Sequence, residues 1–152
     1  MRDTAIAGEA AVAGSGIELA VEPGLSSEEF VDVLERSGLA ERRPVGDPTR
    51  IVAMLRHANL IVTARDGGRL IGVARSVTDF AFCCYCSDLA VDRAYQGRGI
   101  GRALMVRTRD EAGRAANGAP VRCLLLSAPK AMSYYPHVGL KPLDNAFDFT
   151  DL

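Results

Sequence analysis

Three glycines at alternate positions separate an apolar run from a helix-like run in this chain of 152 residues. Gly97, Gly99 and Gly101 lie in the stretch YQGRGIGRAL. Glycine weakens both strands and helices, so three in five residues require a reason. The first turn of a helix presents unpaired N–H groups and the positive end of the helix dipole, which together bind phosphate. The glycines therefore indicate either a site where a pyrophosphate approaches the backbone or a tight strand-to-helix turn without a ligand.

Two well-known phosphate-binding loops do not fit these glycines. The pattern G-x-x-x-x-G-K-[ST] has no match in the sequence, and G-x-G-x-x-G fails at its sixth position whether it is counted from Gly97 or Gly99. The pattern that matches is Q-x-x-G-x-G, at residues 96–101, with LAVDRAY before it and RALM after it. This segment closely resembles the acetyl-CoA loop of the GNAT superfamily of N-acetyltransferases, and the resemblance covers roughly residues 17–149.

The resemblance implies how the chain would hold acetyl-CoA. In the family, backbone amides of the loop bind the CoA pyrophosphate, and the preceding strand is splayed from its neighbour so that its open edge pairs with the pantetheine arm. A family asparagine that contacts the cofactor corresponds to Ala128, and the adjacent Ser127 is its expected substitute. The expected cofactor-binding residues are Leu89, Ala90, Val91, Gln96, Gly97, Arg98, Gly99, Ile100, Gly101, Arg102 and Ser127.

A second match to the family lies in the stretch YYPHVGL. Members often carry a tyrosine four residues before a Gly-Phe pair, and here Tyr135 stands four residues before Gly139 and Leu140. The resemblance implies that Tyr135 donates a proton to the departing CoA thiolate, and simple packing is the alternative. We expect its neighbour Tyr134 to lie in the core.

The general base is the least clearly marked part of the site. A primary amine attacks a thioester only after losing a proton, which requires a base or a chain of water molecules. Many family members carry Glu about eleven residues before the loop, but Tyr85 occupies that position here. Asp88 is the nearest acid, and three roles stay open for it: the base, a contact to the acceptor, or a polar residue at a strand bulge. A backbone N–H near Leu89 is the expected donor to the oxyanion.

The cysteines do not follow a metal-binding or disulfide pattern. Cys83, Cys84 and Cys86 lie in one apolar run, Cys123 is distant, and the chain has only two histidines. Adjacent strand residues point to opposite faces, so the run CCYC suits neither a disulfide framework nor a zinc site built from C-x-x-C pairs. We therefore expect no metal, reduced and buried structural thiols, and a cytoplasmic location. A covalent route through Cys84 or Cys86 is the less favoured alternative, because neither has a basic partner nearby in the sequence.

The rest of the sequence predicts the elements that would position these residues. Ser26 or Ser27 caps a helix that ends at Gly38, and Asp47 followed by Pro48 starts the next one. The expected strands are 17–23, a hairpin within 59–77, 80–91, 121–128 and 146–149, and the expected helices are 26–39, 46–58, 99–114 and 129–135.

This order, β-α-α-β-β-β-α-β-α-β, predicts an α/β fold of three layers with a mixed antiparallel and parallel sheet. The resemblance adds a splay at the fourth strand. We expect residues 1–15 to be a flexible tail and residues 16–152 to be one N-acetyltransferase domain. Only twelve residues follow Leu140. The sheet is therefore expected to be shortened or to be completed by a partner chain, as in a homodimer.

The charge and composition of the chain restrict the classes of partner that it is expected to bind. The formal net charge of −1 predicts no general attraction to nucleic acid or to an anionic membrane, and no stretch of 18 apolar residues or signal-peptide pattern is visible. We expect transfer of an acetyl group from acetyl-CoA to a primary amine by direct attack in a ternary complex, with a small-molecule amine favoured. The alternatives are a protein lysine or N-terminus, or a non-catalytic module that binds CoA. We expect residues 38–50 and 76–84 to build the acceptor pocket.

Overall fold

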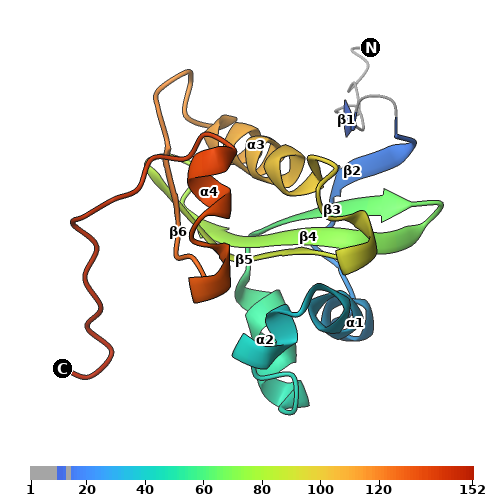
Figure 1. The fold of residues 1–152 in the computed structure, drawn as a ribbon. Helices are drawn as coiled ribbons and strands as arrows, with labels where there is room; N and C mark the ends of the chain where they lie inside the picture. The colour runs from blue at the N-terminus through green and yellow to red at the C-terminus, as the bar shows by residue number, and fades with distance from the viewer. Residues whose placement is uncertain (1–9, 13–14) are drawn as a thin grey trace, which may run out of the picture.

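The computed structural model describes residues 10–12 and 15–152, which form a six-stranded sheet with helices on both faces (Figure 1). The strands lie side by side in chain order, every neighbouring pair is antiparallel except the last, and β5 and β6 are parallel. The mixed α/β sheet predicted from the sequence is thus confirmed. The strands are β1 (Ala10–Ala11), β2 (Ile17–Val21), β3 (Leu60–Asp66), β4 (Arg69–Thr78), β5 (Cys83–Val91) and β6 (Arg122–Leu125).

Two helices cover each face of the sheet, with α1 and α2 on one side and α3 and α4 on the other (Figure 1). The helices are α1 (Ser27–Ser37), α2 (Pro48–His57), α3 (Ile100–Gly113) and α4 (Tyr134–His137), with short 3-10 turns η1 (Leu39–Arg42), η2 (Arg93–Tyr95) and η3 (Pro129–Ala131). In the described part of the chain, no helix combines the length and the apolar character needed to cross a membrane.

The first two helices begin and end where their sequence signals predict. The Ser26 side chain accepts the Glu29 N–H at the start of α1, and Gly38 ends that helix with a φ of 88°. Asp47 accepts the Arg50 N–H at the start of α2, directly before Pro48. These three caps satisfy backbone groups that the helices themselves leave unpaired.

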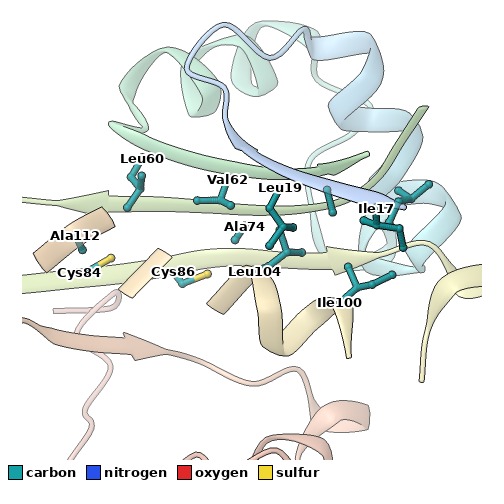
Figure 2. Close-up of a cluster of buried hydrophobic side chains, with 12 residues drawn as sticks. Ile17, Leu19, Leu60, Val62, Ala74, Cys84, Cys86, Ile100, Leu104 and Ala112 are labelled. Atoms are coloured by element: carbon teal, nitrogen blue, oxygen red, sulfur yellow. The ribbon is translucent and has the colours of Figure 1, made fainter. Parts of the chain in front are cut away.

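A β-bulge at Ser87 divides β5 into two halves of opposite orientation. Arg75 of β4 pairs with Asp88, but the next residue pairs with Cys86, so Ser87 is the extra residue. Before the bulge, Cys86 packs into the core cluster on the α3 side (Figure 2), and after it Ala90 packs into the cluster under α1 and α2. The bulge therefore turns Asp88 toward α1 and α2.

The sheet opens between its last two strands. β5 and β6 pair over only four positions, from Cys83 opposite Arg122 to Cys86 opposite Leu125. Within the described residues, the segment from Ser87 to Val91 has no partner on the β6 side. This is the splay at the fourth predicted strand, and it leaves one backbone edge of β5 open.

The C-terminal segment differs from the prediction. Residues 146–149 were expected to form a last strand, but residues 141–152 form no helix or strand and extend from the body (Figure 1). A strand needs a ladder partner, whereas the backbone N–H groups of this segment donate locally, Thr150 N–H to the Asp148 carboxylate and Leu152 N–H to the Phe149 carbonyl.

Two further boundaries differ from the sequence-based expectation. The predicted helix 129–135 is divided into η3 and α4, because Pro136 is tolerated only in the first turn of a helix and α4 therefore starts late, at Tyr134. Within the segment expected to be a flexible tail, Ala10–Ala11 pair with Glu18 and Leu19 of β2. Residues 1–9 and 13–14 of that segment lie outside the described residues.

Candidate active site

The glycine loop ends in an uncapped helix N-terminus. Gly99 is the N-cap of α3, has a φ of 80°, and offers no side chain to the first-turn N–H groups. Gly97 also lies in the left-handed region, with a φ of 77°. A Cβ added at either glycine would meet nothing within 4 Å, so the space over the loop is open. A helix N-terminus without a side-chain cap, next to a glycine loop with open space beside it, fits the pyrophosphate of a CoA thioester.

Polar contacts that the sequence did not reveal hold the start of this loop. The Asp92 carboxylate accepts the Ala94 N–H at 2.9 Å and contacts Arg36 of α1, which also donates to the Leu70 carbonyl at 2.6 Å. Burial raises the pKa of Asp92, but the Ala94 N–H and the Arg36 guanidinium outweigh it and keep that pKa below its usual value. These bonds tie the end of β5 to α1.

Most side chains of the loop interact with residues that are close to them in the sequence. Gln96 donates to the Val91 carbonyl at 2.9 Å. Arg98 lies over the Tyr95 ring, 5.0 Å from its centroid. Ile100 is 1% exposed and anchors α3 in the core, so it offers a ligand only its backbone. Arg102 is exposed beside the loop.

The other predicted cofactor contacts lie along the opening of the sheet. Leu89 and Val91 are half-buried against the α3-side cluster, whereas Ala90 is buried on the opposite face. Ser127, just after β6, donates its hydroxyl to the Ala128 carbonyl at 2.8 Å. The loop, the unpaired edge of β5 and Ser127 thus border the same opening.

Helix α4 contributes two adjacent tyrosines to this opening. The rings of Tyr134 and Tyr135 are edge-on, with centroids 5.2 Å apart. A Cβ on Gly101 would lie 2.5 Å from the Tyr134 hydroxyl, so this hydroxyl rests against the first turn of α3. Tyr134, expected in the core, is therefore half-buried beside the loop. The sequence carries no signal for this contact.

Tyr135 is half-buried beside Tyr134. Burial raises the pKa of its phenol, the nearby Cys86 and Tyr134 add to the rise, and the Arg43 guanidinium partly offsets it. The net shift is upward, so the hydroxyl keeps its proton at neutral pH. A protonated phenol at the opening can donate to a developing anion.

Asp88 is fully buried between two guanidinium groups. Its side chain is 0% exposed, and the Nε atoms of Arg43 and Arg75 contact different carboxylate oxygens. Arg75 also donates to the Met54 carbonyl of α2 at 3.1 Å, and Arg43 donates to the Ser87 carbonyl at 2.8 Å. Asp88 therefore sits at the bulge, where it joins β4, α2 and the segment after η1.

The thiols near the opening are poorly suited to attack. Burial is the main reason that the pKa of Cys86 rises to about 12 and that of Cys84 to about 11. The thiolate is the nucleophilic form, so both are unreactive at neutral pH. All four cysteines are free, but Cys83 and Cys123 are exposed, unlike the expected buried thiols. Among the residues that the structure describes, no group of three metal-binding side chains occurs.

The fold and this site are those of a known protein superfamily. Residues 27–139 match the Acetyltransferase (GNAT) family. Because this match spans most of the sequence, the chain belongs to the GNAT family. The splayed strands β5 and β6, the glycine loop and α4 all lie inside the matched range.

Curated relatives agree with this assignment. The chain is 31% identical to GCN5-related N-acetyltransferase 2, chloroplastic, from Arabidopsis thaliana, over 59% of this chain and 45% of the relative. It is 33% identical to the histone acetyltransferase TAP1 of Glycine max, over 53% of this chain and 40% of the relative. The chain thus spans less than half the length of these relatives.

Solved structures share the fold. A Staphylococcus aureus protein of unknown function, SA2161, described as a probable acetyltransferase, superposes with a TM-score of 0.70 at 20% identity, covering 90% of this chain and 98% of the other. The aminoglycoside acetyltransferase meta-AAC0020 from an uncultured soil sample, in complex with sisomicin, gives a TM-score of 0.67 at 14% identity, covering 88% and 94%.

Proposed function

We propose that the chain is an N-acetyltransferase that transfers an acetyl group from acetyl-CoA to a primary amine by direct attack in a ternary complex, with a small-molecule amine favoured. The observation that carries this proposal is the uncapped N-terminus of α3 under an open glycine loop. It lies next to the unpaired edge of β5, and a protonated phenol stands at the same opening.

Each part of the site has a role in this reaction. Bound acetyl-CoA supplies a thioester carbonyl to the amine. The backbone of residues 96–101 binds the pyrophosphate, and the edge of Leu89, Ala90 and Val91 aligns the pantetheine arm and donates to the oxyanion. Tyr135 donates to the departing sulfur.

Asp88 has a positioning role in this proposal. Both its oxygens are engaged by Arg43 and Arg75, and its side chain is closed to solvent. An amine therefore has no approach to it, and we assign removal of the ammonium proton to water in the opening. Asp88 acts by holding the bulge that sets the direction of the β5 edge.

The alternatives to this proposal are one other class of acceptor, a protein amine, and one non-catalytic function. The name of TAP1 says that this relative acts on histones, which supports a protein lysine or N-terminus as the alternative acceptor. The sisomicin complex of meta-AAC0020 supports a small amine instead. A module that only binds CoA would show stabilisation without turnover. A cytoplasmic location is part of this proposal and is supported by the free cysteines.

Acetyl-CoA is expected to stabilise the folded chain in a thermal unfolding experiment. A ligand that binds only the native state at 100 times its Kd adds about 2.7 kcal/mol, which corresponds to a rise in Tm of about 5–10 °C for a chain of this size. Gly99→Ala should at least halve this rise, because the added methyl projects into the open space over the loop.

The matched control is Gly68→Ala, in the β3–β4 turn. Gly68 has a φ of 84°, and a Cβ there also meets nothing within 4 Å, so both variants carry the same backbone cost. The control should lose stability similarly but keep the full acetyl-CoA effect. If the wild type shows no shift at millimolar acetyl-CoA, or both variants lose it equally, the proposed cofactor site is wrong.

A further inference from the structure

An apolar row crosses three neighbouring strands at one end of the sheet. Val77 of β4 pairs with Tyr85 of β5, and Tyr85 pairs with Leu124 of β6. Directly paired residues project from the same face, so these three side chains form one row, called the apolar stripe below. They are 48%, 41% and 41% exposed, respectively. Exposed apolar side chains that lie next to one another offer a surface on which an apolar ligand can be buried.

The apolar stripe lies on the face of the sheet that α1 and α2 cover elsewhere. Val73 packs in the core cluster under these helices, and Val77 is four residues further along the same strand. Between them, Arg75 reaches the Met54 carbonyl of α2. On the opposite face, Cys86 packs into the α3-side core (Figure 2).

The stripe adjoins the opening between β5 and β6. Tyr85 directly precedes Cys86, the last residue of β5 that pairs with β6. Arg43 contacts Asp88, which the bulge places on the same face as the stripe. The stripe therefore borders the opening, on the face that Asp88 and Arg43 occupy.

The glycine loop leads into α3, on the opposite side of the sheet. In a ternary complex the amine must reach the thioester from the side that the cofactor leaves free. On that side, beside the opening, it meets the apolar stripe. We propose that the apolar stripe is the acceptor subsite and that it takes a primary amine carried on an aromatic or branched aliphatic body. This inference rests on the proposed function.

The charges around the stripe favour a single amine. The three side chains of the stripe are uncharged, and the Arg43 guanidinium stands near its inner end. At its outer end, Arg122 lies 4.9 Å from the centroid of the Phe82 ring, while the Asp79 carboxylate accepts backbone N–H groups of its own turn. A polyamine would place further ammonium groups over uncharged surface close to guanidinium groups, which is unfavourable.

The test compares three acceptors with acetyl-CoA: 2-phenylethylamine, ethylamine and spermidine. We expect kcat/KM for 2-phenylethylamine to exceed that for each of the other two by about tenfold or more. Val77→Ser and Leu124→Ser should each reduce this preference several-fold, because they remove apolar contact area from the stripe. The matched control is Val21→Ser, because Val21 is a strand valine on β2 that is 39% exposed. We expect this substitution to leave the preference unchanged.

The outcomes of this test distinguish failure of the proposed function from failure of the acceptor inference. If no amine releases CoA, the proposed function fails. If CoA is released but spermidine or ethylamine is the best acceptor, or if the preference survives both stripe variants, this inference alone is overturned. A second copy of the chain could cover the stripe instead of the amine, and light scattering on the same samples measures the oligomeric state. If the wild type is a dimer, Val77→Ser dissociates it and the amine preference is unchanged, the stripe is a dimer interface and the inference is overturned. Unchanged Tm values would confirm that the variants fold.

Discussion

Tyr135→Phe is expected to lower kcat about 100- to 10,000-fold, the range for loss of a general acid, with little change in acetyl-CoA affinity. The substitution removes only the hydroxyl, so packing against Tyr134 is kept. The raised pKa of Tyr135 keeps the phenol protonated at neutral pH, and the acid function is lost only as pH rises above the ordinary phenol value of about 10. Steady-state kinetics across pH, with acetyl-CoA binding measured separately, check both statements.

The neighbouring tyrosine provides the control. Tyr134→Phe removes a hydroxyl from the same helix, and burial raises the pKa of Tyr134 as well. Its hydroxyl rests against Gly101 at the start of α3, so we expect an effect on KM for acetyl-CoA and little effect on kcat. If the kcat loss follows Tyr134→Phe and Tyr135→Phe retains wild-type turnover, the acid is Tyr134.

Asp88→Asn is expected to destabilise the protein by about 3–5 kcal/mol, the cost of breaking a buried ion pair from one side. The amide can still accept one hydrogen bond, but its NH₂ group then faces the second guanidinium. Arg75 is nearly buried and Arg43 is partly buried, so both would lose their shared partner. Chemical denaturation should detect the change, together with a fall in Tm of about 6–20 °C.

Asp47→Asn is the matched control for this substitution. Asp47 is an exposed N-cap of α2 that accepts the Arg50 N–H, and asparagine caps helices about as well as aspartate. We expect a stability change of less than about 0.5 kcal/mol there. The positioning role fails if Asp88→Asn is equally mild. The base role returns if that variant instead loses turnover mainly at low pH and recovers as pH rises.

Short-range signals in the sequence were sufficient for the helix boundaries and for the glycine loop. Ser26, Gly38 and Asp47 act on backbone groups within a few residues, so their effects can be predicted without knowledge of the fold. The left-handed conformation of Gly97 and Gly99 is likewise a local property of glycine. The pattern at residues 96–101 therefore identified both the start of α3 and the family.

Only the tertiary structure decided which side chains reach the opening. Asp88 meets Arg75, 13 residues away, and Arg43, 45 residues away, because an extra residue at Ser87 reverses the orientation of β5. Side-chain periodicity cannot locate such a bulge, since it arises from pairing with β4. The contact of Tyr134 with α3 has the same origin, because it depends on how two distant helices pack. The expected last strand failed for a related reason: alternating apolar residues make a strand only where a neighbouring backbone supplies hydrogen bonds.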